Sequence, residues 1–348
     1  MTKLNVLYQS NEAFVIPLAV SMLSLYENNK AIDRLEVYVI DDHIEEHSRK
    51  HLTELAAWFG RELHFIYVDD IERFLIENDI EMQQVDSYTT FMKIFVADLL
   101  PQLDRILYID ADTIVLDSLA ELCDLSLEGY GCAMVNTAMC GKVKTFLDTP
   151  DYCNAGVIYI HLKYWREQGI QKQFSDVIIG KDRKRYTLVG DESLFNLVLQ
   201  GKILKIPLKY NFDSSWWLWG WNKSLYRKLG WTKGNTPYGT AEEILRCREH
   251  PAIAHYINLT TGRPWEDHND NPFRKEFAYY LERLRPWQPI LLPNTGIGSK
   301  HILLVKLKYL VRKMMPFGIR SVIGFHQHES AWQRKIDQYK REAHDDRT

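Results

Sequence analysis

Apolar runs and amphipathic runs alternate along the first third of the chain. Four short apolar runs that are typical of strands lie at 4–8, 35–41, 62–69 and 105–110. Helical spacing of apolar residues occupies 14–28, where Pro17 fits the first turn, and 48–60, where Gly60 ends the helix. Strands that alternate with helices form parallel βαβ units. The pattern therefore predicts an α/β fold with a central, mainly parallel sheet flanked by helices.

The middle of the chain has a more mixed pattern. We predict a strand and then the start of a helix over 152–165, a short amphipathic helix over 191–201, and a strand after Pro251. The stretch 211–221 carries four tryptophans, Trp216, Trp217, Trp219 and Trp221. Their aromatic faces could stack on an acceptor sugar or fill the core beneath a loop, and the sequence favours neither.

The character of the chain changes after Trp287. Residues 293–298 have the turn composition of a linker, and 300–320 combine basic and apolar side chains with a partly helical spacing. Such a segment can pack on the domain or lie on an anionic membrane surface, and we favour the membrane. The sequence therefore predicts a main domain over 1–287 and a basic, amphipathic helical extension over 288–348.

Composition and charge exclude some classes of function. The net charge of −3 over 348 residues gives no field that would attract nucleic acid, so no nucleic-acid partner is expected. Residues 13–25 form the longest early apolar stretch, which is too short and too interrupted to span a bilayer. Five cysteines without a CxxC pair indicate free thiols in a reducing compartment. We therefore expect a cytoplasmic protein, either soluble or bound peripherally to the inner face of the cell membrane.

Two carboxylates stand at the end of the fourth predicted strand, in the sequence LYIDADTIVL at 107–116. Ligands of open α/β sheets bind beyond the carboxyl ends of the strands, where Asp110 lies. Asp110 and Asp112 could both reach one hard divalent cation, and oxygen ligands suit Mg²⁺ or Mn²⁺. They could instead be solvated acids in a turn. The pattern D-x-D-x-T also resembles the nucleophile and general acid of haloacid dehalogenase-like phosphatases, although that motif normally opens the chain.

Histidines supply further candidate ligands. His255 follows an apolar strand in HYINLTTGRPW at 255–265 and could give the same metal a nitrogen ligand. Arg263, in the loop after it, could hold a diphosphate through paired N–H donors. A single histidine is more often a core residue than a ligand, so His255 gains weight only together with other features. His43, His47 and His51 recur every four residues and could also bind a metal, but a solvated helix face is the simpler interpretation.

Four segments occur in an order that resembles glycosyltransferase family 8: YIDADTIV, NAGVIYIHLKYW, GDESLFN and HY…RPW. This family includes bacterial lipopolysaccharide galactosyl- and glucosyltransferases and, more distantly, glycogenin. The resemblance covers about residues 3–285. It implies a GT-A fold and transfer of a hexose from a UDP-sugar, with retention, using Mn²⁺ or Mg²⁺. The acceptor would be a glycan, which could be lipid-linked, in the synthesis of lipopolysaccharide, capsule or a glycosylated surface protein.

The resemblance also implies roles for individual residues. Asp110, Asp112 and His255 would be the metal ligands, and the metal would neutralise charge as UDP leaves. Asp191 matches the acid that holds donor-sugar hydroxyls, and Glu192 falls where many relatives carry Gln, on the face of the sugar where a nucleophile would be sought. These two are the candidate catalytic residues. Donor contacts are expected from Tyr8, Gln9, Ser10, Asn11, Lys93, Ala111, Asn136, Asn154, Ala155, Gly262 and Arg263.

Some of these positions depart from the pattern of the family. Ser10 and Asn11 stand where acids are usual, Lys93 where Arg is common, and Asn136 where Asp is common. The loss of these charges leaves open whether the hexose is galactose or glucose. A degenerate transferase that binds a glycan or nucleotide without turnover is the alternative. No metal ligand is lost, and we therefore expect an active enzyme.

Overall fold

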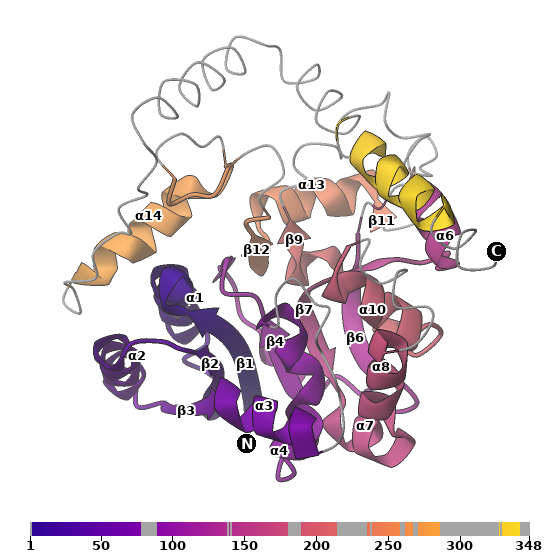
Figure 1. Ribbon diagram of the computed structural model, residues 1–348. Coiled ribbons are helices and arrows are strands. Elements are labelled where there is room, and N and C mark those ends of the chain that lie inside the picture. The colour runs from indigo at the N-terminus through magenta and orange to yellow at the C-terminus, as the bar shows by residue number, and fades with distance from the viewer. Residues whose placement is uncertain are drawn as a thin grey trace, which may run out of the picture.

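A seven-stranded sheet lies at the centre of the molecule, with strand order β3-β2-β1-β4-β7-β6-β8 (Figure 1). The computed structural model describes residues 2–77, 89–137, 139, 141–179, 189–213, 235–236, 239–257, 262–266, 271–285, 327 and 329–341. The strands of the sheet are β1 (Lys3–Asn11), β2 (Arg34–Asp42), β3 (Glu62–Tyr67), β4 (Ile106–Ile109), β6 (Cys132–Asn136), β7 (Cys153–Ile160) and β8 (Ile203–Lys205). Only β7 runs antiparallel to its neighbours, so the predicted mainly parallel sheet is confirmed.

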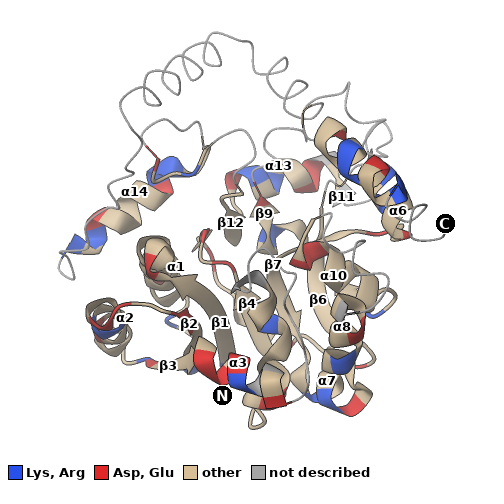
Figure 2. Ribbon diagram, in the orientation of Figure 1, with Lys and Arg blue, Asp and Glu red and all other residues tan. Residues whose placement is uncertain are grey.

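Each face of the sheet is covered by helices that bury an apolar core. One core includes residues of α1 (Val15–Asn28), α2 (Glu46–Trp58), α13 (Ala241–Glu249) and α14 (Arg274–Arg283). The other includes residues of α3 (Val68–Glu77), α7 (Leu162–Gln168), α8 (Ile170–Ile179) and α10 (Asp191–Val198). Strands β4, β6 and β7 carry no charged residue, and charge gathers on the helices (Figure 2). Continuously apolar strands are typical of a sheet that is buried on both faces.

Shorter elements complete the described part of the fold. They are η1 (Glu12–Phe14), η2 (Thr89–Phe95), α4 (Val96–Leu99), α5 (Ala120–Cys123), α6 (Gly141–Leu147), η3 (Leu208–Tyr210), and the two-stranded sheet of β10 (Asn235–Thr236) and β11 (Gly239–Thr240). The predicted strand over 62–69 ends at Tyr67, because Val68 begins α3. Acidic residues in the first turn of α3 favour that helix start. Gly60 has φ +62 just beyond α2, as expected of a helix-ending glycine.

A second, three-stranded sheet brings distant segments together at the carboxyl end of β4. Its order is β5 (Thr113–Val115), β12 (Ile253–His255) and β9 (Phe212–Asp213). The antiparallel pairing of β12 with β5 sets His255 opposite Thr113, and its parallel pairing with β9 sets His255 opposite Asp213. This register places three separate parts of the chain beside the Asp-x-Asp turn.

The C-terminal helix, residues 329–341, packs against α6 (Figure 1). The Phe146 and Tyr339 rings stack with their centroids 6.2 Å apart, and Lys142 Nζ lies 3.8 Å from Glu329 Oε1. Ile336 is buried against the main core. The last part of the predicted extension is thus helical and docked on the domain, while the boundary at residue 287, the basic stretch 300–320 and Trp216–Trp221 lie outside the described residues.

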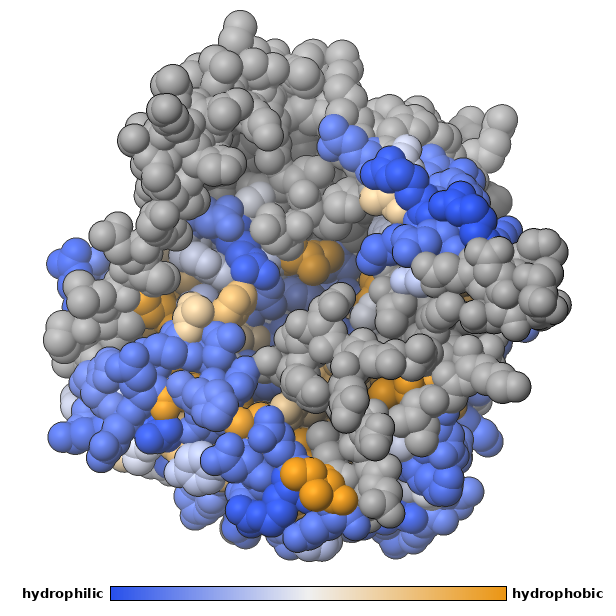
Figure 3. Space-filling model, in the orientation of Figure 1, coloured by the Kyte–Doolittle hydropathy of each residue, from blue (hydrophilic) through white to orange (hydrophobic). Residues whose placement is uncertain are grey.

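Other predictions concern the surface and the cysteines. Among the described residues, no helix is long and apolar enough to cross a membrane. On the side seen in Figure 3, the surface formed by the described residues is mostly hydrophilic, with small scattered apolar areas. The four described cysteines, Cys123, Cys132, Cys153 and Cys247, are free and buried. These free thiols agree with the prediction made from the absence of a CxxC pair.

Candidate active site

The turn between β4 and β5 carries Asp110 and Asp112, and backbone hydrogen bonds hold it against two other strands. The Asp110 N–H donates to the Gly156 carbonyl of β7 (2.8 Å), and the Tyr256 N–H donates to the Asp112 carbonyl (2.8 Å). The Thr113 hydroxyl donates to the Asp110 carbonyl (2.9 Å). These bonds fix both carboxylates beside the end of β12.

Asp110, Asp112 and His255 form a group that could hold a metal ion. Their ligand atoms all lie within 4.8 Å of one another. His255 Nε2 is 3.5 Å from Asp110 Oδ2 and 3.4 Å from Asp112 Oδ1. Two carboxylates and one imidazole are a donor set that suits Mn²⁺, and Mg²⁺ accepts the carboxylate oxygens. The three residues that were predicted as metal ligands therefore fit a divalent cation.

Asn211 orients the imidazole of His255. Its Oδ1 lies 3.0 Å from His255 Nδ1, and its Nδ2 donates to Asn154 Oδ1 (2.7 Å). An amide oxygen only accepts, so Nδ1 carries the hydrogen and Nε2 faces the two carboxylates. Asn154 Oδ1 also accepts from the Gly156 N–H (2.9 Å). Hydrogen-bonded partners of this kind fix the direction of a ligating imidazole.

Gly156 leaves the space that the ligand group fills. A Cβ at this position would lie 2.1 Å from His255 Cε1 and 2.8 Å from Asp110 Oδ2. Neither atom belongs to the free end of a long side chain, so neither can move away easily. The glycine of the NAG segment is therefore required for His255 and Asp110 to approach each other.

Asp191 and Glu192 lie in the first turn of α10, next to the Asn154–Gly156 segment. Glu192 Oε2 accepts from Asn154 Nδ2 (2.6 Å) and from the Ala155 N–H (3.4 Å). Lys93 Nζ lies 2.6 Å from Asp191 Oδ2 and donates to the Ala155 carbonyl (3.3 Å). The predicted catalytic residues are thus joined to the metal group through one short segment of β7.

Burial and charge shift the pKa values of the ligand group in different directions. Burial raises the pKa of Asp110, although Lys93 and His255 oppose the shift. Burial would also raise the pKa of Asp112, but the hydrogen bond and charge of His255 and the charge of Arg263 lower it. Burial favours neutral His255, but Asp112 and Asp110 outweigh it and raise its pKa to about 9. The carboxylates therefore stabilise positive charge at this place.

Glu192 has a strongly shifted pKa. Burial, reinforced by the charges of Asp191 and Asp213, raises the pKa of Glu192 to about 8. A carboxyl group with a pKa near neutral can hold or release a proton under ordinary conditions, which is the property of a general acid or base.

Arg263 borders the metal group next to Asp112. Its guanidinium nitrogen lies 3.9 Å from Asp112 Oδ2. Its guanidinium carbon lies 4.8 Å from the ring centroid of Phe14 and 5.5 Å from that of Trp265. The Arg263 Nε is buried and has no hydrogen-bond partner in the described part of the chain. A buried donor without a partner is uncommon and is expected where a ligand binds.

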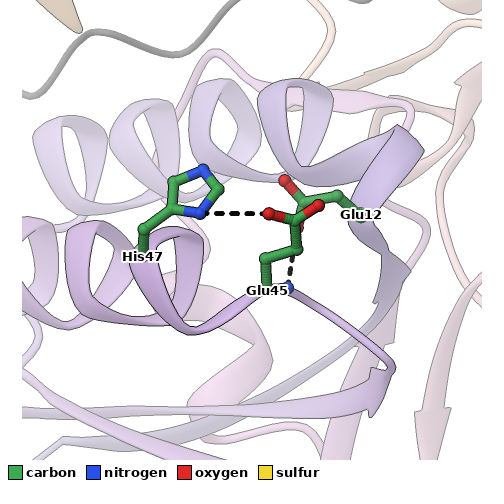
Figure 4. Close-up of side chains that lie close together, drawn as sticks. All are labelled: Glu12, Glu45 and His47. Carbon is green, nitrogen blue, oxygen red and sulfur yellow. Dashed lines mark hydrogen bonds and ion pairs between the residues drawn. The ribbon is translucent and has the colours of Figure 1, made fainter.

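A second group of possible ligands lies at the start of α2 and consists of Glu12, Glu45 and His47 (Figure 4). The Glu12 carboxylate accepts from the Glu45 N–H (2.8 Å) and from the Ser48 hydroxyl (2.8 Å). His47 and Glu45 are mostly exposed, with His47 Nδ1 3.3 Å from Glu45 Oε2. His43 precedes the helix with φ +60, so the three histidines do not share a helix face. Glu12 therefore caps α2, and the group is a solvated helix end.

Comparison with known proteins decides the family. Residues 5–269 match the sequence model of Glycosyl transferase family 8. The chain belongs to glycosyltransferase family 8. General stress protein A of Bacillus subtilis (strain 168) is 26% identical over 273 residues, which cover 77% of this chain and 89% of that protein. Lipopolysaccharide 1,2-glucosyltransferase of Escherichia coli (strain K12) is 26% identical over 316 residues, which cover 88% of this chain and 84% of that protein.

Solved structures with the same fold are glycosyltransferases. The galactosyltransferase LgtC, in complex with donor and acceptor sugar analogues, superposes with a TM-score of 0.61 at 20% identity, covering 82% of this chain and all of that one. GlyE of Streptococcus pneumoniae TIGR4 gives a TM-score of 0.55 at 21% identity, covering 80% of this chain and 60% of that one. The predicted GT-A fold and family are confirmed, and the protein is a glycosyltransferase. The phosphatase alternative receives no support.

The structure places the predicted donor-binding residues in different surroundings. Gln9 Oε1 and Asn11 Oδ1, at the carboxyl end of β1, are buried without a hydrogen-bond partner among the described residues. Ser10 is also buried, and its hydroxyl donates to the Asn11 carbonyl (2.9 Å). The Tyr8 side chain is fully buried with its hydroxyl 3.1 Å from that of Ser21, so this ring lies inside the core.

The remaining predicted donor contacts lie on other segments around the turn. Asn136 ends β6 and accepts from the Cys153 thiol (3.3 Å). Ala111 is buried between the two aspartates of the turn. Gly262 has φ +71, a conformation that favours glycine, one residue before Arg263. The donor-binding roles of all these residues stay predictions.

Three residues of this site are absent from the sequence-based predictions: Tyr108, Asn211 and Asp213. Tyr108 donates to Asp110 Oδ1 (2.5 Å), and burial raises the pKa of its hydroxyl well above the usual range, so it keeps its proton. Asp213 is buried on β9, opposite His255, and accepts from the Thr137 hydroxyl (3.3 Å). Strand pairing between distant segments brings Asn211 and Asp213 to the site, so no local pattern marks them, whereas Tyr108 lies two residues before Asp110 and its spacing could have indicated the contact.

Proposed function

We propose that this glycosyltransferase moves a hexose, galactose or glucose, from a UDP-sugar to a glycan acceptor, with retention and with Mn²⁺ or Mg²⁺ held by Asp110, Asp112 and His255. The observation that carries the proposal is the buried ligand group on the carboxyl edge of the sheet, which is joined through Asn154 to Glu192. The nucleotide-sugar donor that the family implies would bind with its diphosphate at this carboxyl edge, beside the cation.

The charges of the site match those that develop as the donor breaks. Departure of UDP builds negative charge on the diphosphate and positive charge on the sugar. A bound cation supplies a Lewis acid that neutralises the former. The Arg263 guanidinium, which contacts the Phe14 and Trp265 rings, offers N–H donors that would bind the same negative charge. Asp191 and Glu192 offer carboxylates to the side of the sugar, where positive charge is stabilised.

Two features support an acceptor on the bacterial surface. A relative of similar length acts in lipopolysaccharide synthesis, as its name states. The basic stretch 300–320 suits contact with an anionic membrane that carries a lipid-linked acceptor. We therefore place the enzyme in the cytoplasm, with peripheral binding to the inner face of the membrane through its C-terminal segment.

The test is a panel of nucleotide sugars with the purified chain. Thermal unfolding is measured with UDP-glucose, UDP-galactose and UDP-N-acetylglucosamine, each with and without Mn²⁺, because a ligand that binds only the folded state raises the melting temperature. UDP release is then measured with the best donor, and NMR of the product gives the anomeric configuration. We expect stabilisation and UDP release that require Mn²⁺, and a retained anomer.

The alternatives predict other results. Stabilisation by UDP and Mn²⁺ without any UDP release would favour the degenerate binding module. UDP release that is unchanged after removal of all divalent cations would rule out the metal assignment. An inverted product would contradict retention.

A further inference from the structure

Tyr108 contacts one carboxylate of the metal group in a specific way. Its hydroxyl donates to Asp110 Oδ1 (2.5 Å), whereas the other oxygen of that carboxylate, Oδ2, faces His255 Nε2 at 3.5 Å. The hydroxyl therefore occupies one oxygen and leaves the other directed at the place where the cation would bind. Without this bond, the Asp110 carboxylate could rotate.

The ring of the same side chain contacts the other half of the site. Lys93 Nζ lies 4.1 Å from the Tyr108 ring centroid, and the same ammonium lies 2.6 Å from Asp191 Oδ2. Tyr108 and Lys93 are 3% and 2% exposed, so both contacts form away from water, where cation–π and charge-assisted interactions are strongest. One tyrosine thus links a metal ligand to a carboxylate of the predicted sugar site.

We propose that Tyr108 is a positioning residue: its hydroxyl fixes the direction of the Asp110 carboxylate for the cation, and its ring holds the Lys93 ammonium that orients Asp191. The inference rests on the proposed metal-dependent function. It extends that function by naming a side chain that touches neither the cation nor the donor and that sets the geometry of both halves of the site.

The structure offers a matched control for removal of the hydroxyl. Tyr38 on β2 is also buried, and its hydroxyl donates to Glu36 Oε2 (3.1 Å), a carboxylate two residues away on its own strand. Tyr108→Phe and Tyr38→Phe therefore each remove a buried tyrosine–carboxylate bond from the same sheet. Only the first of these bonds involves a metal ligand.

The first experiment measures Mn²⁺ binding in the absence of nucleotide, from the paramagnetic resonance signal of free Mn²⁺ during titration of the full chain. Loss of a hydrogen-bonding partner of a metal ligand weakens metal binding by roughly 10- to 100-fold. We expect that loss for Tyr108→Phe and a change of less than about twofold for Tyr38→Phe. Circular dichroism establishes that each variant is folded.

The second experiment tests the Lys93 ammonium that contacts the ring and Asp191, and it remains available if Tyr108→Phe does not fold. Lys93→Met removes the ammonium above the ring but leaves the hydroxyl in place. It also removes a positive charge near the cation, so Mn²⁺ should bind at least as tightly as in the wild type. Hydrolysis of the donor should fall about tenfold or more, because Asp191 loses its partner.

Each outcome has a separate meaning. If the wild type binds no Mn²⁺, the metal-dependent function and the inference both fail. If the wild type binds Mn²⁺ and Tyr108→Phe binds it equally well, or if Tyr38→Phe weakens it as much, only the role of Tyr108 is overturned. The proposal assigns metal binding to the hydroxyl and the orientation of Asp191 to the ring and Lys93. A tenfold loss of Mn²⁺ binding in Lys93→Met would overturn that assignment.

Discussion

Two groups of side chains in this protein offer two carboxylates and an imidazole, yet their surroundings differ. Asp110, Asp112 and His255 lie at the meeting point of two sheets, and the His255 side chain is 3% exposed. The group of Glu12, Glu45 and His47 lies at a helix end, where the side chains of His47 and Glu45 are 57% and 63% exposed. The two groups have the same types of ligand atom at similar separations. These two properties therefore cannot distinguish a metal site from a helix cap.

The difference lies in what holds the ligand atoms. In the buried group, Asn211 fixes His255, Gly156 makes room for it, and Tyr108 fixes Asp110. In the exposed group, the Glu12 oxygens already accept hydrogen bonds from the start of α2. A preorganised group in a low-dielectric environment attracts a cation more strongly than exposed carboxylates, whose charges are screened by water.

Removing one ligand from each group should give the largest contrast. Asp112→Ala is expected to lower Mn²⁺-dependent UDP release by about a thousandfold or more, because the cation supplies several kcal/mol of charge stabilisation. Glu12→Ala should leave the release rate nearly unchanged and destabilise α2 by about 1 kcal/mol through loss of a helix cap. Steady-state kinetics and urea unfolding measure the two effects. Comparable loss of activity in both variants would remove the distinction between the groups.

A methyl group placed at Gly156 should disrupt the buried group by steric contact alone. Gly156→Ala puts a Cβ 2.1 Å from His255 Cε1, so we expect destabilisation by about 1–3 kcal/mol and loss of most Mn²⁺ affinity. Gly141→Ala is the matched control, since a Cβ there has nothing within 4 Å. Urea unfolding and Mn²⁺ titration report the two quantities. Full Mn²⁺ affinity in Gly156→Ala would show that the site tolerates a different arrangement of His255.

Loss of the residue that orients His255 should have an intermediate effect. Asn211→Ala removes the bonds to His255 Nδ1 and to Asn154, and we expect Mn²⁺ affinity to fall by roughly 10- to 100-fold. Asn29→Ala removes two bonds of another buried asparagine, to the Leu25 carbonyl and the Leu119 N–H, neither of which belongs to a metal ligand or its partner. Both variants should lose stability, but only Asn211→Ala should lose metal affinity. Calorimetric titration measures the Mn²⁺ affinity of both variants, and an equal loss in the two would contradict a specific role of Asn211.

A further prediction concerns the pH dependence of stability. Glu192 has a pKa of about 8 when folded, against an ordinary value of 4.5, so the folded state binds more protons between these values. The free energy of unfolding contributed by this group is therefore present at low pH and is lost as pH rises from about 5 to about 8. Glu192→Gln does not ionise, and its stability relative to the wild type should increase over that range. Urea unfolding without metal at several pH values measures this, and parallel curves for the two proteins would show that Glu192 titrates normally.

Much of the architecture could be predicted from the sequence, because its cause is local. The alternation of apolar strands with amphipathic helices is found in the parallel strands β1, β2 and β3 and in the helices between them. The ordered motifs around Asp110, Asn154, Asp191 and His255 predicted the family and a common site. Ends of elements were less certain, as at Val68, where the strand predicted to continue gives way to α3.

Only the tertiary structure decided how the site is assembled. Asn211 and Asp213 reach it because β9 pairs with β12, and His255 reaches it because β12 pairs with β5. The helix 329–341 likewise packs on α6, about two hundred residues earlier in the chain. Such pairings join segments far apart in sequence and depend on the packing of the whole chain, so no spacing or composition within a single segment encodes them. The sequence by itself thus determined which residues offer ligand atoms, and the fold determined which of those groups is buried and held in place.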